Sequence, residues 1–170
     1  EWGMEQCVRD LRIAQIYEGT NGIQSQDLIG RKTIKCEGAY LKAYIDEIRD
    51  FANQMDAELN FIKDATLDAA TELESVTRFI LEAAQENPNF ANAVAVDYLH
   101  ALGLLSFSYM FARIAEAAQD KSTPFYQAKI NLAIYFVQRV LPELPMRISK
   151  IKAGADVIMR FSPEYFTQQS

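Results

Sequence analysis

Apolar residues recur three and four positions apart over most of the chain, a spacing that places them on one face of an α-helix. The first stripe consists of Leu41, Tyr44, Ile45, Ile48, Phe51, Ala52 and Met55. The second consists of Leu59, Ile62, Thr66, Ala70, Leu73, Thr77 and Ile80. The third consists of Tyr98, Leu102, Leu105, Tyr109 and Ala112, with a second apolar face formed by Leu104, Phe107, Phe111 and Ile114. The fourth consists of Ile130, Ile134, Val137 and Leu141. Because no run shows the alternation typical of strands, the pattern predicts an all-α fold.

Proline residues mark the expected ends of these helices. The segment Asn87–Asn89 has proline at its centre, which predicts the end of one helix and the cap of the next. Thr123 before Pro124 is typical of a helix start, with the threonine as N-cap and the proline at the first helical position. Pro142 and Pro145 predict a kink or an interruption of the last long helix.

These signals predict that residues 37–160 form four long helices with short connections, the pattern of an antiparallel helical bundle. The polar tail, residues 162–170, is expected to be loosely packed. The most apolar segment, Leu99–Ala112, contains Ser106 and Ser108 and is shorter than the ~20 residues that a membrane span needs. It is therefore predicted to be a buried core helix.

Composition narrows the classes of function. The net charge of −6 disfavours binding to a nucleic-acid backbone. Cys7 and Cys36 form no CxxC pair, and we expect free thiols rather than a disulfide. The single histidine, His100, is expected to be packed in the bundle, and one histidine is too few for a zinc site. The basic residues of the last third are expected to form a solvated face, with a partner surface or a CoA phosphate as the alternative; they are Lys121, Lys129, Arg139, Arg147, Lys150 and Lys152.

The first 36 residues have a different pattern, a helix followed by a tight loop from Glu18 to Gly22 and a second helix from about Ile23. A carboxylate on a short glycine-bounded loop between two helices is well placed to point into a cleft. The residues alone leave two interpretations open. Glu18 belongs to a functional site, or it is a solvated loop residue next to a turn.

The stretch from Arg9 to Gln24 resembles the C-terminal signature of acyl-CoA dehydrogenases, in which an Arg-Asp-x-Arg/Lys-Ile helix leads into Ile-Tyr-Glu-Gly-Thr and then Ile-Gln. The matching residues are Arg9, Asp10, Arg12, Ile13, Ile16, Tyr17, Glu18, Gly19, Thr20, Asn21, Ile23 and Gln24. The continuation Asp27–Lys32 is similar to a bacterial branch with an extra C-terminal helical region, which includes the methylthiopropanoyl-CoA dehydrogenases. The resemblance is strong over residues 1–35 and weak beyond them.

The resemblance implies a role for each residue of the loop. Glu18 would be the base that removes the α-proton of an acyl-CoA thioester, while the β-hydrogen leaves as hydride to N5 of FAD. Gly19 would lie against the substrate. Contacts to FAD would come from Thr20, Asn21, Gly22 and Gln24.

The same resemblance implies how the chain is divided. Residues 1–36 would be the end of the catalytic helical domain with its catalytic loop, and residues 37–170 a four-helix C-terminal extension. Both parts would belong to a cytoplasmic oxidoreductase, a dimer or tetramer that passes electrons to an electron-transfer flavoprotein. We expect this chain alone to be inactive, since most of the FAD and CoA sites would lie elsewhere.

Two alternatives stay open at this point. An acyl-CoA oxidase uses a similar glutamate but returns its flavin to the oxidised state with oxygen. A non-catalytic helical module for oligomerisation or interaction would retain the loop without using it.

Overall fold

The computed structural model describes residues 4–16 and 19–167, apart from the side chains of residues 15 and 16, and every regular element in these ranges is helical. The N-terminal elements are α1 (Glu5–Ile16), α2 (Asn21–Gln26) and the π-helix η1 (Asp27–Ile34). The bundle elements are α3 (Ala39–Ala52), the short 3₁₀ turn η2 (Ala57–Leu59), α4 (Asn60–Glu86), α5 (Phe90–Ala118), α6 (Pro124–Arg139) and α7 (Glu143–Ala153). The C-terminal elements are α8 (Asp156–Met159) and the 3₁₀ turn η3 (Pro163–Phe166). The predicted all-α fold is confirmed.

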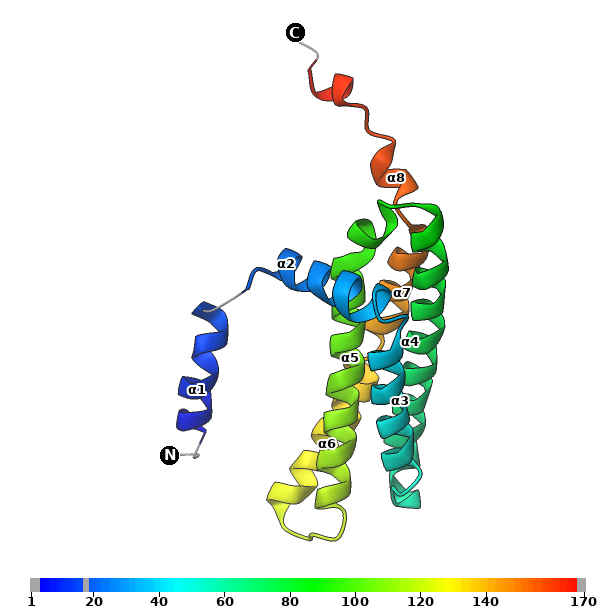
Figure 1. Ribbon diagram of the computed structural model, residues 1–170. Coiled ribbons are helices and arrows are strands. Elements are labelled where there is room, and N and C mark those ends of the chain that lie inside the picture. Colours follow the sequence, from blue (N-terminus) through cyan, green and yellow to red (C-terminus); the bar gives the residue numbers. More distant parts are fainter. Residues whose placement is uncertain (1–3, 17–18, 168–170) are drawn as a thin grey trace.

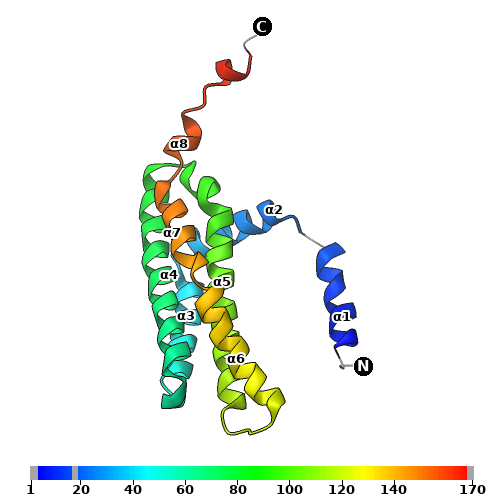
Figure 2. The same ribbon diagram turned by 180° about the vertical axis from the view of Figure 1, so that it is seen from behind.

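Two long helices, α4 and α5, run side by side along the whole bundle (Figure 1). Helix α3 lies beside α4, while α6 and α7 follow one another along α5, as the view from behind shows (Figure 2). The helix formed by α2 and η1 crosses α5, and α1 stands apart from the bundle (Figure 1).

The last long helix is interrupted where the prolines predicted it. Helix α6 ends at Arg139 and α7 begins at Glu143, with Pro142 between them. The amides of Val140 and Leu141 both donate to the carbonyl of Phe136, at 2.9 Å each. The hydrogen-bond pattern of the helix therefore ends before the proline. The expected four long helices are therefore α3, α4, α5 and a fourth that is divided into α6 and α7.

The core forms around α4 and α5. Every residue of the stripe from Leu59 to Ile80 is buried, as the spacing predicted. On α5, Tyr98 and Leu105 are fully buried. Burial of apolar surface on this scale is the main favourable term in folding.

Two details of α5 differ from the prediction. Its second apolar face is only partly covered, because Phe107 and Ile114 are 60% and 40% exposed. The prediction of a packed His100 is also wrong: its side chain is exposed. Two residues along an α-helix correspond to a rotation of about 200°, so a buried Tyr98 turns His100 to the opposite side.

Helix α5 is also long and apolar enough to meet a length-and-composition test for a membrane span. The core helix of a bundle passes the same test, and α5 packs against α4, α6 and α7. The prediction of a buried core helix is confirmed for one side of α5, while its second apolar face is partly exposed.

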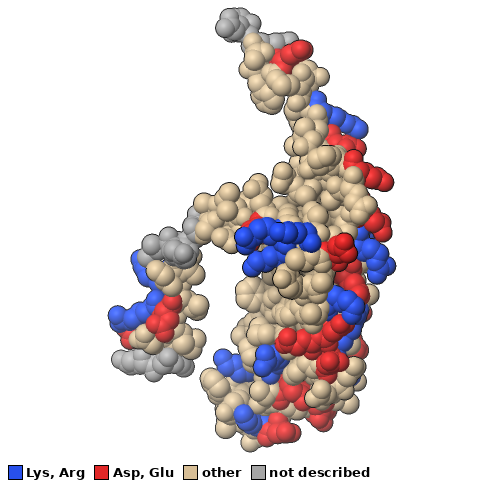
Figure 3. All heavy atoms as spheres, viewed as in Figure 1, with Lys and Arg blue, Asp and Glu red and all other residues tan. Residues whose placement is uncertain are grey.

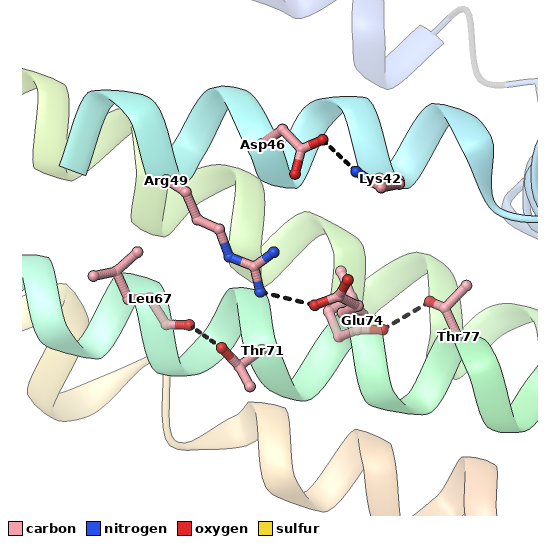
Figure 4. Close-up of polar contacts among 8 residues, drawn as sticks. Lys42, Asp46, Arg49, Leu67, Thr71, Glu74 and Thr77 are labelled. Carbon is pink, nitrogen blue, oxygen red and sulfur yellow. Dashed lines mark hydrogen bonds and ion pairs between the residues drawn. The ribbon is translucent and has the colours of Figure 1, made fainter. Parts of the chain in front are cut away.

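Polar contacts add direction to the packing between helices. The Arg49 guanidinium of α3 pairs with the Glu74 carboxylate of α4 at 2.8 Å (Figure 4). Along α4, the hydroxyls of Thr71 and Thr77 donate to carbonyls one turn earlier, at 2.9 and 2.7 Å (Figure 4). Thr71 is exposed, whereas the bond of Thr77 satisfies a buried hydroxyl group that would otherwise be costly.

The predicted free thiols are confirmed by their positions. Cys7 is exposed on α1 and Cys36 is partly buried in the turn after η1, and neither forms a disulfide.

Candidate functional site

The loop predicted to be catalytic connects α1, which ends at Ile16, to α2, which begins at Asn21. Glu18 itself lies outside the described residues, and its assignment as the base stays a prediction. The second helix begins two residues earlier than expected, because the amide of Gln24 already donates to the carbonyl of Thr20 at 3.0 Å. Asn21 and Gly22 therefore belong to the first helical turn rather than to the loop.

Thr20 holds an unusual backbone conformation, with φ 52° and ψ 128°. A β-branched residue with positive φ is an outlier, since its Cβ crowds the neighbouring carbonyl. Such strain costs on the order of 1–3 kcal/mol and is found preferentially at functional sites. The strained residue lies directly before the α2 helix and two positions after Glu18.

Gly19 and Gln24 lie against one another across this first turn. A Cβ added at Gly19 would approach the Gln24 side-chain amide nitrogen to 2.0 Å, whereas a Cβ at Gly22 would meet no heavy atom within 4 Å. Glycine at position 19 thus lets the Gln24 side chain fold back over the loop. Gly22 leaves its side of the turn open to an approaching group.

Helices α2 and η1 form one continuous helix, because the residues at their junction, Gln26 and Asp27, both have right-handed helical angles. We call residues Asn21–Ile34 the α2–η1 helix. Its buried face consists of Ser25, Ile29 and Thr33, which are 1%, 1% and 2% exposed. In an α-helix a residue four positions along overshoots a full turn by about 40°, whereas a π-helix has more residues per turn and falls short of one. The two drifts oppose one another, so the π-helical segment keeps all three residues on the face that packs on the bundle.

The end of the α2–η1 helix meets a cluster of buried hydroxyl groups formed by Thr33, Tyr98 and Thr77, which we call the hydroxyl cluster. Thr33 Oγ1 lies 3.5 Å from Tyr98 Oη, and Thr77 Oγ1 lies 3.0 Å from it. Tyr98 is fully buried. Burial raises the pKa of Tyr98 above its usual value, while the hydrogen bonds to Thr33 and Thr77 oppose the shift. The phenol therefore remains a neutral donor at neutral pH.

A groove borders the hydroxyl cluster, with a volume of about 470 Å³. The α2–η1 helix contributes Leu28, Lys32 and Thr33 to its wall, and α5 contributes Tyr98 and Leu102. The apolar packing of the α2–η1 helix against the bundle is thus incomplete at this end.

Charge is distributed unevenly around the site. Basic side chains gather over η1, whose sequence includes the exposed residues Arg31 and Lys32, while acidic side chains follow α3 and α4 (Figure 3). Arg31 is paired within its own helix with Asp27. In the last third of the chain, Arg147 is not a solvated cation as expected, because it pairs with Asp97 of α5 at 2.8 Å.

The loop residues fit one edge of an FAD molecule by their chemistry. Thr20, Asn21, Gly22 and Gln24 are all exposed and offer hydroxyl, amide and backbone N–H donors without charge. They cannot enclose a cofactor, because nothing in the described residues covers them. Within residues 4–16 and 19–167, no group of three His, Cys, Asp or Glu side chains is arranged to hold a metal ion.

Helical spacing predicted that Tyr98 and Thr77 lie in the core but did not connect them with the loop, and the burial of Ser25 and Thr33 was not predicted. The spacing of four between Ser25, Ile29 and Thr33 was the available signal. It was weak, because two of the three residues are polar and a π-helix does not follow the 3.6-residue period.

Comparison with known proteins agrees with the resemblance seen in the loop. Residues 44–162 match the family described as "Acetyl-CoA dehydrogenase C-terminal like". A 3-methylmercaptopropionyl-CoA dehydrogenase of Ruegeria pomeroyi is 31% identical over 170 residues, which cover 95% of this chain and 29% of the relative. A broad-specificity linear acyl-CoA dehydrogenase of Mycobacterium tuberculosis is 26% identical over 182 residues, covering 98% of the chain and 30% of the relative. A butyryl-CoA dehydrogenase of Syntrophomonas wolfei is 30% identical over 155 residues, which cover 84% of this chain and 25% of the relative.

The chain spans less than a third of the length of these relatives and aligns with them over most of its own length. The family match covers the bundle, from within α3 to the segment after α8. This protein therefore belongs to the family of acyl-CoA dehydrogenase C-terminal domains.

Proposed function

We propose that this chain is the C-terminal part of an FAD-dependent acyl-CoA dehydrogenase that introduces an α,β double bond into an acyl-CoA thioester. The observation that supports the proposal is the Tyr17–Thr20 motif, which occupies the connection between the end of α1 and the start of α2. The family of the bundle and the relatives' names agree with that motif.

In the proposed reaction, the Glu18 carboxylate takes the α-proton of the thioester. An α-C–H group next to a thioester is a weak acid, so the base has to be positioned and partly desolvated to act at neutral pH. Bound FAD would supply the acceptor for the hydride that leaves the β-carbon. The product is a trans-enoyl-CoA, and the proton remains on Glu18 until it is released.

The neighbours of Glu18 have positioning roles in this proposal. The strained backbone of Thr20 directs the chain out of the loop and into the α2–η1 helix. Gly19 would lie against the substrate, and the Gln24 side chain beside it would turn away to make room. The donors of Thr20, Asn21, Gly22 and Gln24 would hold one edge of FAD.

The remaining parts of the proposal concern the complete protein. We propose that the bundle packs against the rest of a homo-oligomeric, cytoplasmic enzyme and that an electron-transfer flavoprotein accepts its electrons. The chain alone would bind FAD weakly and show no turnover, because its loop residues are exposed and contact the cofactor at one edge only.

The test is the visible spectrum of the complete protein that contains this chain, recorded while a panel of acyl-CoAs is added without oxygen. The flavin absorbance should bleach with the wild type, and the Glu18→Gln variant should bleach about 10²–10⁴-fold more slowly, the usual contribution of a positioned general base. The matched control is Glu86→Gln, at an exposed glutamate at the end of α4, which should bleach at the wild-type rate.

Three results would contradict the proposal. A protein without FAD would instead be a helical interaction module, and equal bleaching of Glu18→Gln and wild type would remove Glu18 as the base. Rapid return of the oxidised spectrum on admitting air would identify an oxidase instead of a dehydrogenase.

A further inference from the structure

The α2–η1 helix connects the loop directly to the bundle without a break. Its first residue, Asn21, follows the loop directly, and its last turn ends in the hydroxyl cluster. Because no break separates α2 from η1, a rotation or shift at Thr33 moves the loop end as well. The position of the loop therefore depends on the packing of α2 on α5 and also on what fixes the other end of the helix.

Apolar packing alone does not fix that end. Ile29 is fully packed and Leu28 packs partly against the core, but the adjoining groove of about 470 Å³ leaves one side of the helix near Leu28 and Lys32 incompletely covered. Apolar contacts also lack direction, whereas a buried hydrogen bond depends on the distance and angle between its atoms. Thr33 is the residue of η1 whose buried hydroxyl meets a hydroxyl of the bundle.

The protons of the hydroxyl cluster can be counted. Thr77 donates its one proton to the carbonyl of Leu73 at 2.7 Å, so the 3.0 Å contact requires that Tyr98 donates to Thr77. Thr33 donates to the carbonyl of Leu28 at 3.0 Å or to Tyr98 Oη at 3.5 Å, but not to both. The oxygen of Tyr98 is therefore oriented by α4 and keeps its lone pairs toward Thr33 of η1.

We propose that Tyr98 is a positioning residue for the candidate catalytic loop, because its buried hydroxyl sets the register of the α2–η1 helix on the bundle. This inference rests on the proposed function for its effect on turnover, but its effect on the helix does not depend on that function. Tyr98 is separated from the loop by the length of the α2–η1 helix and acts only through Thr33.

The proton count predicts an unusual phenotype for Tyr98→Phe. Removing the phenol oxygen leaves Thr77 bonded to Leu73, and the Thr33 proton that Tyr98 Oη accepts turns to the carbonyl of Leu28, so no buried donor is left without a partner. Global stability should therefore change little, while the register of the α2–η1 helix is lost. This one substitution should therefore change the position of the α2–η1 helix without changing the free energy of unfolding.

A second hydroxyl pair in the same two helices gives a matched control. Ser108 of α5 lies 2.8 Å from Thr66 of α4, and Thr66 donates to the carbonyl of Ile62 at 2.9 Å. Ser108→Ala therefore removes one buried hydroxyl whose neighbour keeps its own bond, as Tyr98→Phe does. The difference is that this pair does not contact the α2–η1 helix.

The experiment compares these variants in the complete protein, by amide hydrogen exchange and by acyl-CoA-dependent flavin reduction. In Tyr98→Phe and in Thr33→Val, amides of residues 24–34 should exchange at least about three-fold faster, while those of α4 should not change. The rate of flavin reduction should fall about ten-fold with KM nearly unchanged, since small misplacements of a reacting group are costly. Thr33→Ser should keep the wild-type exchange rates and the wild-type rate of flavin reduction. The double variant Tyr98→Phe/Thr33→Val should reduce flavin no more slowly than either single variant.

Ser108→Ala should match Tyr98→Phe in denaturation midpoint and match the wild type in exchange and turnover. The inference is overturned if Tyr98→Phe leaves exchange of residues 24–34 unchanged, or if Ser108→Ala slows flavin reduction as much as Tyr98→Phe does. If wild-type flavin is not reduced by any acyl-CoA, the proposed function fails, and the exchange measurement alone decides whether Tyr98 fixes the helix.

Discussion

At the scale of single residues, the most informative polar contact lies between α5 and α7. Arg147 Nη1 contacts Asp97 Oδ1 at 2.8 Å, and both side chains are largely buried, at 21% and 23% exposed. Glu143 and Lys150 lie at 4.0 Å from members of this pair. Within the described residues, Arg147 Nε is buried without a hydrogen-bond partner. The pair therefore depends on one well-formed contact.

Removing the carboxylate should destabilise the bundle. Asp97→Asn should lower the free energy of unfolding by about 1–3 kcal/mol, because the guanidinium remains largely buried without its charged partner. The measurement is urea denaturation followed by circular dichroism. Asp46→Asn is the control, since its partner Lys42 is exposed and such i,i+4 pairs contribute only about 0.3–0.5 kcal/mol. Equal losses for the two variants would show that partial burial of the Asp97 pair adds nothing.

Single residues also show where prediction from the sequence stops. Apolar spacing identified the buried positions of α4, because a helix with one apolar face leaves no choice of which face to bury. Helix α5 is apolar almost all round, so spacing did not show that Phe107 and His100 would be exposed. Which face of such a helix is covered depends on its neighbours, and the sequence pattern of α5 does not contain that information.

At the scale of elements, breaks were predicted where proline causes them. The α6–α7 break includes Pro142, as predicted, whereas the turn from η1 into α3, which contains Gly38 with φ 75°, was not predicted from its glycine. The continuous α2–η1 helix was not predicted in this form, because nothing in its composition distinguishes a π-helix from an α-helix. The position of the site therefore depends on the element that sequence reasoning describes least well.

The turn at Gly38 allows a clean test of backbone strain. An added Cβ would make ordinary contacts, 3.5 Å to Leu81 and 3.7 Å to Thr77, so the cost of Gly38→Ala should come from the left-handed backbone alone. We expect a loss of about 1–2 kcal/mol in the free energy of unfolding. Gly30→Ala, within η1 and with open space around its Cβ position, should instead be neutral or stabilise by about 0.5–1 kcal/mol. If both substitutions destabilise equally, strain at Gly38 is not the cause.

At the scale of the whole molecule, α5 joins two apolar clusters. The larger cluster includes Leu73, Tyr98 and Leu105, and the smaller one includes Ile62, Ala115 and Val137. Because Phe51, Ala65 and Phe111 pack against both clusters, the two should unfold together. Helix α1, by contrast, has only exposed side chains among those described, and α8 and η3 have no buried residue.

This contrast predicts the order of cleavage by trypsin. Sites at Arg9 and Arg12 of α1 and at Arg160 after α8 should be cut first, because local opening there breaks few buried contacts. Sites within α4, such as Lys63 and Arg78, require opening of the core and should be cut only after the ends are removed. Mass spectrometry of a time course distinguishes the two stages, and early cleavage within α4 would contradict the prediction. In the proposed enzyme, slower cleavage at Arg9 and Arg12 is expected if the exposed apolar residues Val8 and Leu11 of α1 pack against the rest of that protein. Equal rates in the chain and in the proposed enzyme would show that α1 is exposed in both.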